Sequence, residues 1–122
     1  MRRLDTIQQA HKLNNIYSLD DIGPGNAYHR YEVYRINSDT DETCVGMIQM
    51  QKGPRNNSDS IPGCIDSDLL EIVRDRLKQF QTSEFACEEN NIALQHVESA
   101  LWYLNKRVQK RAERGILGTY IV

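Results

Sequence analysis

The sequence predicts an α+β protein in which a small N-terminal antiparallel β-sheet precedes a C-terminal two-helix hairpin with one long helix. All three prolines lie within residues 1–63, where short apolar runs alternate with polar turns. Residues 65–114 contain neither proline nor glycine, and their apolar residues recur at helical spacing. We therefore expect a sheet region over residues 1–63 and a helical hairpin over residues 64–122, folding together as one cooperative domain.

The first region contains two clear strand patterns. YHRYEVYRI alternates loosely and is rich in aromatic and β-branched residues, which favour strands. CVGMIQMQ predicts a second strand, paired antiparallel with the first across the polar segment NSDTDET. A third strand is expected near residues 16–19, and a short amphipathic turn or helix within LDTIQQAHKL. The GPGN segment lacks the context of a P-loop or a Rossmann turn, so it indicates only a chain reversal at Pro24 and Gly25.

Two helices are expected in the second region. Asp68 and Glu71 resemble a capping box at the start of the first helix, and QTSEF breaks the pattern, with Ser83 able to cap the second helix. The second helix should run from about residue 84 to 114 and end at Gly115, a typical helix C-cap. Its apolar seam is formed by Leu94, Val97, Leu101, Leu104 and Val108. At 1.5 Å per residue this helix is roughly 45 Å long, and a partner of about half that length cannot cover it. The remainder of the seam needs a second subunit.

Composition limits the class of protein. Only 39% of the 122 residues are apolar and 26% are charged, so the core should be thin and burial is expected to be completed by oligomerisation. No apolar run suits a membrane span or a signal peptide, which predicts a cytoplasmic protein without a membrane partner. A net charge of −2 argues against a general binder of DNA or RNA.

Nothing in the sequence indicates catalysis or a bound metal. Cys44, Cys64 and Cys87 show no CxxC spacing and are expected to be reduced thiols. The three histidines show no ligand spacing, and no nucleophile elbow or kinase-like set of motifs is present. The sequence therefore predicts a protein that is not an enzyme and needs no cofactor.

Positive charge gathers at the end of the second predicted helix. Five of the 15 basic residues lie between Lys106 and Arg114, opposed only by Glu113. Arg107, Arg111 and Arg114 are spaced four and three, so they form one stripe beside the apolar seam. Guanidinium groups in such a position can bind phosphate in a bidentate manner. The alternative is a solvated helix C-terminus, where cations suit the macrodipole.

Three other features could contact a ligand, and each has a structural alternative. Arg55 lies in the turn GPRNN, where it could bind an anion or stack on a base, or be an ordinary exposed arginine. Phe80 ends the first helix and could offer a face to a nucleobase or belong to the core. Asn90 and Asn91 are poor helix formers near the start of the long helix, where one could bind a ligand or both could face solvent.

The segment LKQFQTSEFACEENNIALQHVESALWYLNKRVQKRAERGILGT resembles a helical hairpin shared by two families of phage anti-defence proteins. Its most specific parts are F-Q…F-A-C-E-E-N and the ending R-x-x-x-R-x-x-R-G-x-x-G-T. With DIGPGNAYHRYEVY and QKGPRNN ahead of it, the chain resembles Thoeris anti-defence proteins of the first type. These are sponges that capture the glycocyclic ADP-ribose signal of bacterial TIR-domain proteins without cleaving it. The related family has the hairpin alone and sequesters the cyclic oligonucleotides of CBASS defence.

The resemblance implies a homodimer or a larger homo-oligomer such as a hexamer, acting in the cytoplasm of the infected bacterium. It implies a pocket in which Phe80 and Arg55 sandwich adenine, with Asn90 or Asn91, Arg107 and Arg111 around the phosphates and riboses. A separate site for cyclic trinucleotides would fall at Arg114, Gly115, Gly118 and Thr119. The rival functions are a sponge mainly for cyclic di- or trinucleotides, an enzyme that degrades the signal, and an assembly protein whose basic stripe pairs with another subunit.

Overall fold

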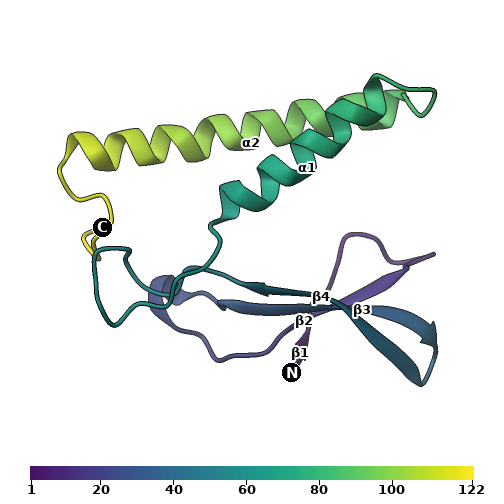
Figure 1. Cartoon of the computed structure of the whole chain (residues 1–122), viewed down its shortest axis with the longest axis horizontal. Coiled ribbons are helices and arrows are strands. Elements are labelled where there is room, and N and C mark those ends of the chain that lie inside the picture. The colour runs from purple at the N-terminus through teal and green to yellow at the C-terminus, as the bar shows by residue number, and fades with distance from the viewer. The chain divides into compact units, whose positions relative to one another are not determined.

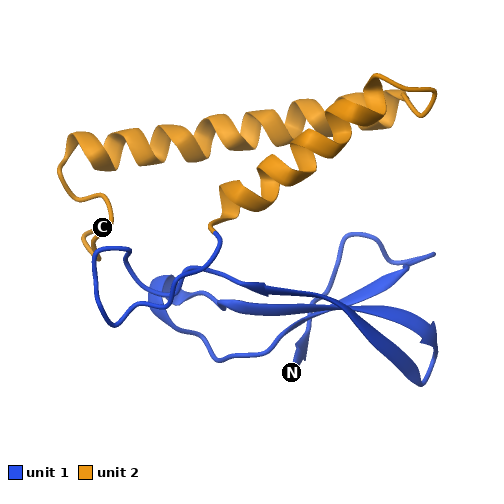
Figure 2. Cartoon of the chain, viewed as in Figure 1, with its two compact units in different colours: residues 1–64 blue, residues 65–122 orange.

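The computed structural model describes all of residues 1–122, which divide into two compact units, Met1–Cys64 and Ile65–Val122 (Figure 2). The first unit is a four-stranded antiparallel sheet, and the second is a pair of helices followed by a turn (Figure 1). The α+β class predicted from the sequence is therefore confirmed.

The sheet is a simple meander in which neighbours along the chain are neighbours in space. Its strand order is β1-β2-β3-β4, and every pair is antiparallel. The strands are β1 (Arg2–Arg3), β2 (Asn14–Ser18), β3 (Arg30–Ser38) and β4 (Asp41–Gln49). The two main predicted strands and the third one near residues 16–19 are confirmed. β4 begins at Asp41, earlier than predicted, so only Asp39 and Thr40 remain as the turn.

The pairing of β3 with β4 is interrupted by a bulge. Val33 pairs with Gly46 and Tyr34 pairs with Cys44, so Val45 is an extra residue without a partner. Such a residue bends its strand and increases the local twist. Val45 is exposed to solvent.

The short amphipathic turn or helix expected within residues 4–13 is absent. The side chains of Thr6 and Gln8 instead donate to nearby carbonyls, those of Gln8 and Ala10 respectively. Bonds of this kind compete with helical hydrogen bonding. Ile7 is fully exposed, so no apolar contact stabilises a helix against this competition.

The second unit is a helical hairpin of α1 (Asp66–Gln81) and α2 (Glu88–Glu113), joined by residues 82–87 (Figure 1). α2 contains 26 residues and is about 39 Å long. The predicted start of α2 at residue 84 is wrong. Its N-cap is Cys87, whose Sγ accepts from the Asn90 N–H at 3.4 Å. Ser83 does not cap α2, because its hydroxyl accepts from the Phe85 N–H within the loop.

The start of α1 also differs from the expected capping box. The N-cap is Ile65, and Asp68 occupies the third helical position. The Asp68 carboxylate accepts from the Ile65 N–H at 2.9 Å, so it satisfies one of the free donors at the helix start. The acidic half of a capping box is present, but three residues away from the predicted position.

α2 ends as the sequence predicts, at Gly115. This glycine has a φ of +70°, a conformation that side chains disfavour, and its N–H donates to Ala112 O. The Ile116 N–H donates to Arg111 O at 3.0 Å. These two bonds complete a Schellman motif.

The core is thin, as the composition predicts. Ile116, at 8% exposure, is the only buried apolar residue, whereas Asn15, Ser18 and His29 are buried polar residues. The apolar residues of the helical seam are half-buried or exposed. Neither helix combines the length and the apolar character that a membrane span requires.

Candidate functional site

The predicted basic stripe lies along a groove on the last turns of α2. The groove has a volume of about 400 Å³ and no acidic residue lines it. Its lining residues are Tyr103, Lys106, Arg107, Lys110, Arg111, Arg114 and Val122. None of these cations is in an ion pair, because the ion pairs of the chain are Arg74 with Glu71 and Glu98, and His29 with Asp20. The groove therefore gathers positive charge that no acidic side chain neutralises.

Arg107 also lines a second groove, which lies between the two helices. This inter-helix groove has a volume of about 710 Å³. Leu101, Leu104 and Val108 contribute its apolar surface, and Trp102 is largely exposed at its side. The sequence-based expectation that the arginine stripe borders the apolar seam thus holds for Arg107.

Arg111 has a structural role that sequence reasoning missed. Its Nη2 donates to the carbonyl oxygens of Ile116, at 3.2 Å, and Thr119, at 3.1 Å. The Thr119 hydroxyl donates to the same Ile116 oxygen at 2.5 Å. Arg111 therefore holds the turn that follows α2. The sequence signal for this role is the pair of glycines, Gly115 and Gly118. These glycines predict that the chain reverses after α2, which brings its carbonyl groups back toward the last turn of the helix.

The four residues suggested for a second nucleotide site lie together in this same turn. Gly115 and Gly118 both have positive φ, of +70° and +77°. Arg114 Nη2 donates to Val122 O at 3.2 Å. The guanidinium of Arg114 and the hydroxyl of Thr119 are therefore already partnered by backbone oxygens.

Phe80 and Asn90 lie at the opposite end of the hairpin, beside the loop that joins the helices. Phe80 is half-buried near the end of α1, and Arg76 Cζ lies 5.4 Å from its ring centroid. Asn90 is half-buried and Asn91 is exposed on the first turn of α2. Asn90 and Arg107 are separated by roughly 25 Å of helix axis at 1.5 Å per residue. One hairpin therefore does not bring Phe80 and Asn90 together with the arginines.

Arg55 belongs to the first unit, in an exposed loop closed by the bridge between Lys52 and Ile61. The loop is held by its own backbone, since the Asn57 N–H and the Ser60 hydroxyl both donate to Pro54 O. The Arg55 side chain is exposed and makes no hydrogen bond in the chain. It is free to bind an anion.

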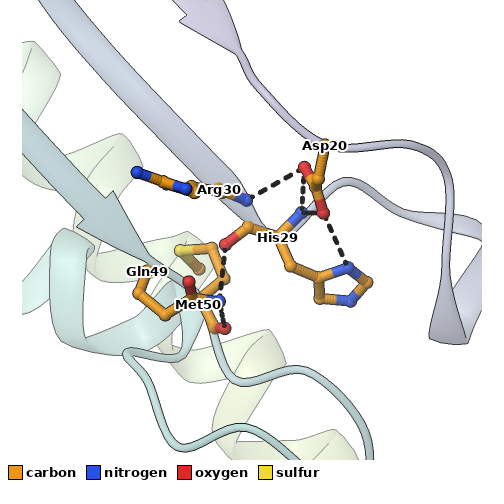
Figure 3. A network of polar contacts seen from close by, with 5 residues as sticks. All are labelled: Asp20, His29, Arg30, Gln49 and Met50. Atoms are coloured by element: carbon orange, nitrogen blue, oxygen red, sulfur yellow. Dashed lines mark hydrogen bonds and ion pairs between the residues drawn. The ribbon is translucent and has the colours of Figure 1, made fainter.

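A polar network in the sheet unit was also missed (Figure 3). The Asp20 carboxylate accepts the N–H groups of His29, at 3.0 Å, and Arg30, at 3.1 Å. Partial burial raises the pKa of Asp20, but these backbone hydrogen bonds outweigh it, and the pKa lies below its usual value. His29 Nδ1 is buried without a hydrogen bond, 3.8 Å from Asp20 Oδ2. Asp20 therefore ties β3 to the loop that precedes it.

Residues able to ligate a metal do not gather in this fold. No group of three or more histidine, cysteine, aspartate or glutamate side chains comes together. The arrangement offers guanidinium groups, ammonium groups and aromatic rings, which suit phosphates and bases.

Residues 34–109 match the Acb2/Tad1 hairpin domain. The chain belongs to this family. It is also 41% identical over 76 residues to Thoeris anti-defense 1 of Bacillus phage SBSphiJ7. That match covers 62% of this chain and 53% of the relative, so the chain spans about half the length of the curated protein it matches. The family match includes Arg55, Phe80, Asn90, Asn91 and Arg107, whereas the terminal motif from Arg111 to Thr119 lies beyond it.

Proposed function

We propose that this chain is a phage anti-defence protein that binds a glycocyclic ADP-ribose signal and sequesters it without cleavage, in the cytoplasm of the infected host. Its family membership and its identity to a Thoeris anti-defense protein support this role. The observation that carries the binding proposal is the separation of complementary groups on one helical hairpin. A ring and an amide lie at one end, and uncompensated arginines lie at the other.

These two sets of groups form a pocket only if a second chain is present. In an antiparallel pairing of two α2 helices about a two-fold axis, one chain brings Arg107 and Arg111 to the Phe80 and Asn90 of its partner. The midpoint of residues 90 and 107 places the crossing near Glu98 and Ser99. The inter-helix groove supports such a pairing, because its apolar wall remains open to solvent in one chain.

Each pocket would then hold the ligand by stacking and by charge. Phe80 supplies the face against adenine, and Arg107 and Arg111 contact the phosphates. Arg111 keeps this role if Nη1 and Nε bind the ligand while Nη2 holds the carbonyls of the following turn. Arg55 is proposed as a further contact to the base. Sequestration requires no general base, nucleophile or metal.

Heating the complex separates a sponge from an enzyme. The protein is incubated with the cyclic ADP-ribose signal, freed of unbound ligand and then denatured. A sponge releases the intact signal in a stoichiometric amount, whereas an enzyme releases a product. Calorimetric titration with cyclic ADP-ribose isomers, cyclic dinucleotides and cyclic trinucleotides then identifies the ligand class. Preference for the cyclic oligonucleotides would favour a CBASS sponge, and failure to bind any of them would refute the proposal.

Mixed dimers test the composite pocket. One subunit carries Phe80→Ala and the other carries Arg107→Ala with Arg111→Ala. One pocket of the mixed dimer then contains all three substitutions, and the other pocket contains none. About one site of full affinity should return per mixed dimer, although each parent binds the ligand more weakly than the unaltered chain. Mixed dimers that demonstrably form but bind nothing would show that the pocket is not shared between chains.

A further inference from the structure

We propose that Tyr103, Lys106 and Lys110 form a separate anion-binding site on α2 that takes a nucleoside diphosphate. Tyr103 stacks on the base and the two lysines contact the phosphates, with Arg107 and Arg114 at the rim. This site shares Arg107 with the proposed sponge pocket, but it goes beyond the sponge function because it uses neither Phe80 nor a second chain. It also differs from the turn at residues 115–119, which none of its three principal residues contacts through a hydrogen bond.

The helix places these side chains on one face. Tyr103, Arg107, Lys110 and Arg114 are spaced four, three and four, and Lys106 lies one turn after Tyr103. All of them line the same groove of about 400 Å³, which is within the size range of small-molecule sites. The distance from Tyr103 to Arg114 is roughly 16 Å along the axis at 1.5 Å per residue. One base with a short phosphate chain matches this length.

The positive charge of this face is not explained by helix stability. The macrodipole favours cations only in the last turn, where Lys110 and Arg111 lie. Lys106 and Arg107 precede that turn, and neither is in an ion pair. Lys106 with Lys110, and Lys110 with Arg114, are like-charge pairs four residues apart, which destabilise a helix. A bound anion would remove this repulsion.

Tyr103 supplies the feature that distinguishes a nucleotide site from a simple phosphate site. Its side chain is 73% exposed, and its hydroxyl makes no hydrogen bond in the chain. An exposed ring next to cations offers a surface on which a base can stack. The groove is short and the whole chain carries a net charge of −2, so the geometry favours a small nucleotide over a nucleic-acid strand.

The test is calorimetric titration of the full chain with ADP and, separately, with inorganic pyrophosphate. The titrations are repeated with Phe80→Ala, which removes stacking at the proposed sponge pocket. ADP should bind more tightly than pyrophosphate in both proteins. Tyr103→Ala should weaken ADP binding by about 5- to 150-fold and leave pyrophosphate binding unchanged, since stacking supplies about 1–3 kcal/mol per base. Tyr103→Phe is the matched control and should retain ADP binding.

The lysines are tested by Lys106→Gln combined with Lys110→Gln, which should weaken ADP and pyrophosphate binding alike. Lys12→Gln combined with Lys78→Gln removes the same charge elsewhere and should change neither. Lys106→Gln alone should not lower the melting temperature, because it removes a repulsive pair.

Equal affinity for ADP and pyrophosphate would overturn the proposal, as would unchanged binding in the Lys106→Gln, Lys110→Gln variant. Loss of ADP binding in Phe80→Ala would assign the nucleotide to the sponge pocket instead. Affinity that rises with the length of an oligoadenylate would indicate a nucleic-acid surface. If Phe80→Ala weakens cyclic ADP-ribose binding and retains ADP binding, the two sites are distinct.

Discussion

Arg74 of α1 and Glu98 of α2 join the two helices, because Arg74 Nε donates to Glu98 Oε2 at 2.9 Å. Arg74 also approaches Glu71 on its own helix, at 3.4 Å. The hydrogen bond to Glu98 is the main cause that raises the pKa of Arg74. This pair is the clearest polar link within a hairpin that buries little apolar surface.

We expect Arg74→Ala and Glu98→Ala each to lower the melting temperature. The double variant should melt at nearly the same temperature as either single variant. The coupling should shrink at high salt, because both side chains are partly exposed. Glu71→Ala is the control and should have a smaller effect, since its contact with Arg74 is longer and more exposed. Additive single effects in thermal melts would show that the pair does not stabilise the hairpin.

Phe80→Ala should weaken binding of the cyclic ADP-ribose ligand by about 1–3 kcal/mol, the usual contribution of a base stacked on an aromatic ring. Calorimetry measures this loss per folded molecule. If Phe80 instead serves the hairpin core, the melting temperature will fall markedly and affinity per folded molecule will be intact. Phe85→Ala removes an exposed ring from the neighbouring loop and is the matched control.

Arg111→Lys should release the turn that follows α2. Lysine lacks the planar fork with which Arg111 reaches the oxygens of Ile116 and Thr119, so the loss should cost about 1–2 kcal/mol of unfolding free energy. Amide hydrogen exchange at Ile116 and Thr119, whose N–H groups are hydrogen-bonded, should accelerate. Unchanged exchange at these amides would show that the turn does not depend on Arg111.

Asp20→Asn should destabilise the sheet at neutral pH by about 1–2 kcal/mol, because the charged acceptor of the His29 and Arg30 N–H groups is lost. The pKa of Asp20 is lowered in the folded protein, so the stability it contributes is present above the unfolded pKa and is lost as pH falls through the folded pKa. The difference between Asp20→Asn and the unaltered chain in urea melts should therefore shrink in strong acid. Asp21→Asn, at the exposed neighbour, is the control. A difference that stayed constant with pH would exclude this role of Asp20.

The sheet region and the hairpin should unfold together, because neither has enough buried apolar surface alone. Ile116 is the only buried apolar residue in the chain. A fragment of residues 65–122 is expected to show a broad, shallow melt and weak ligand binding. A sharp melt with full binding would mean that the sheet is dispensable and that Arg55 is not a site residue.

Periodicity predicts the two helices and the three longer strands of this fold, but not β1, whose two residues are too few to show a pattern. Gly115 is also predictable, since few other residues adopt its positive φ. The start of α2 could not be predicted in this way, because a cysteine sulfur serves as its cap. Asp20 and Arg111 escaped prediction for a related reason. Their partners are backbone groups, which no pattern of side chains identifies, and for Arg111 the glycines at 115 and 118 indicate only that the chain turns back.

The sequence does not distinguish arginines that are free to bind a ligand from arginines that hold the backbone. A basic stripe on a helix is visible from spacing, but spacing does not show which guanidinium is already occupied. Arg107 has no partner within the chain, whereas Arg111 and Arg114 both hold backbone oxygens. Distinguishing them requires the path of the chain after α2.

The irregular pairing of β4 affects the concentration that this protein can reach without aggregating. β1 and β4 are the outer strands of the sheet, and outer strands are templates for aggregation. β1 has only two residues, and β4 is distorted by the unpaired Val45, so both edges are poor templates. Under the proposed function, capture is stoichiometric, so the protein would have to accumulate to at least the concentration of its ligand. Blunted sheet edges allow that accumulation without strand-to-strand polymerisation.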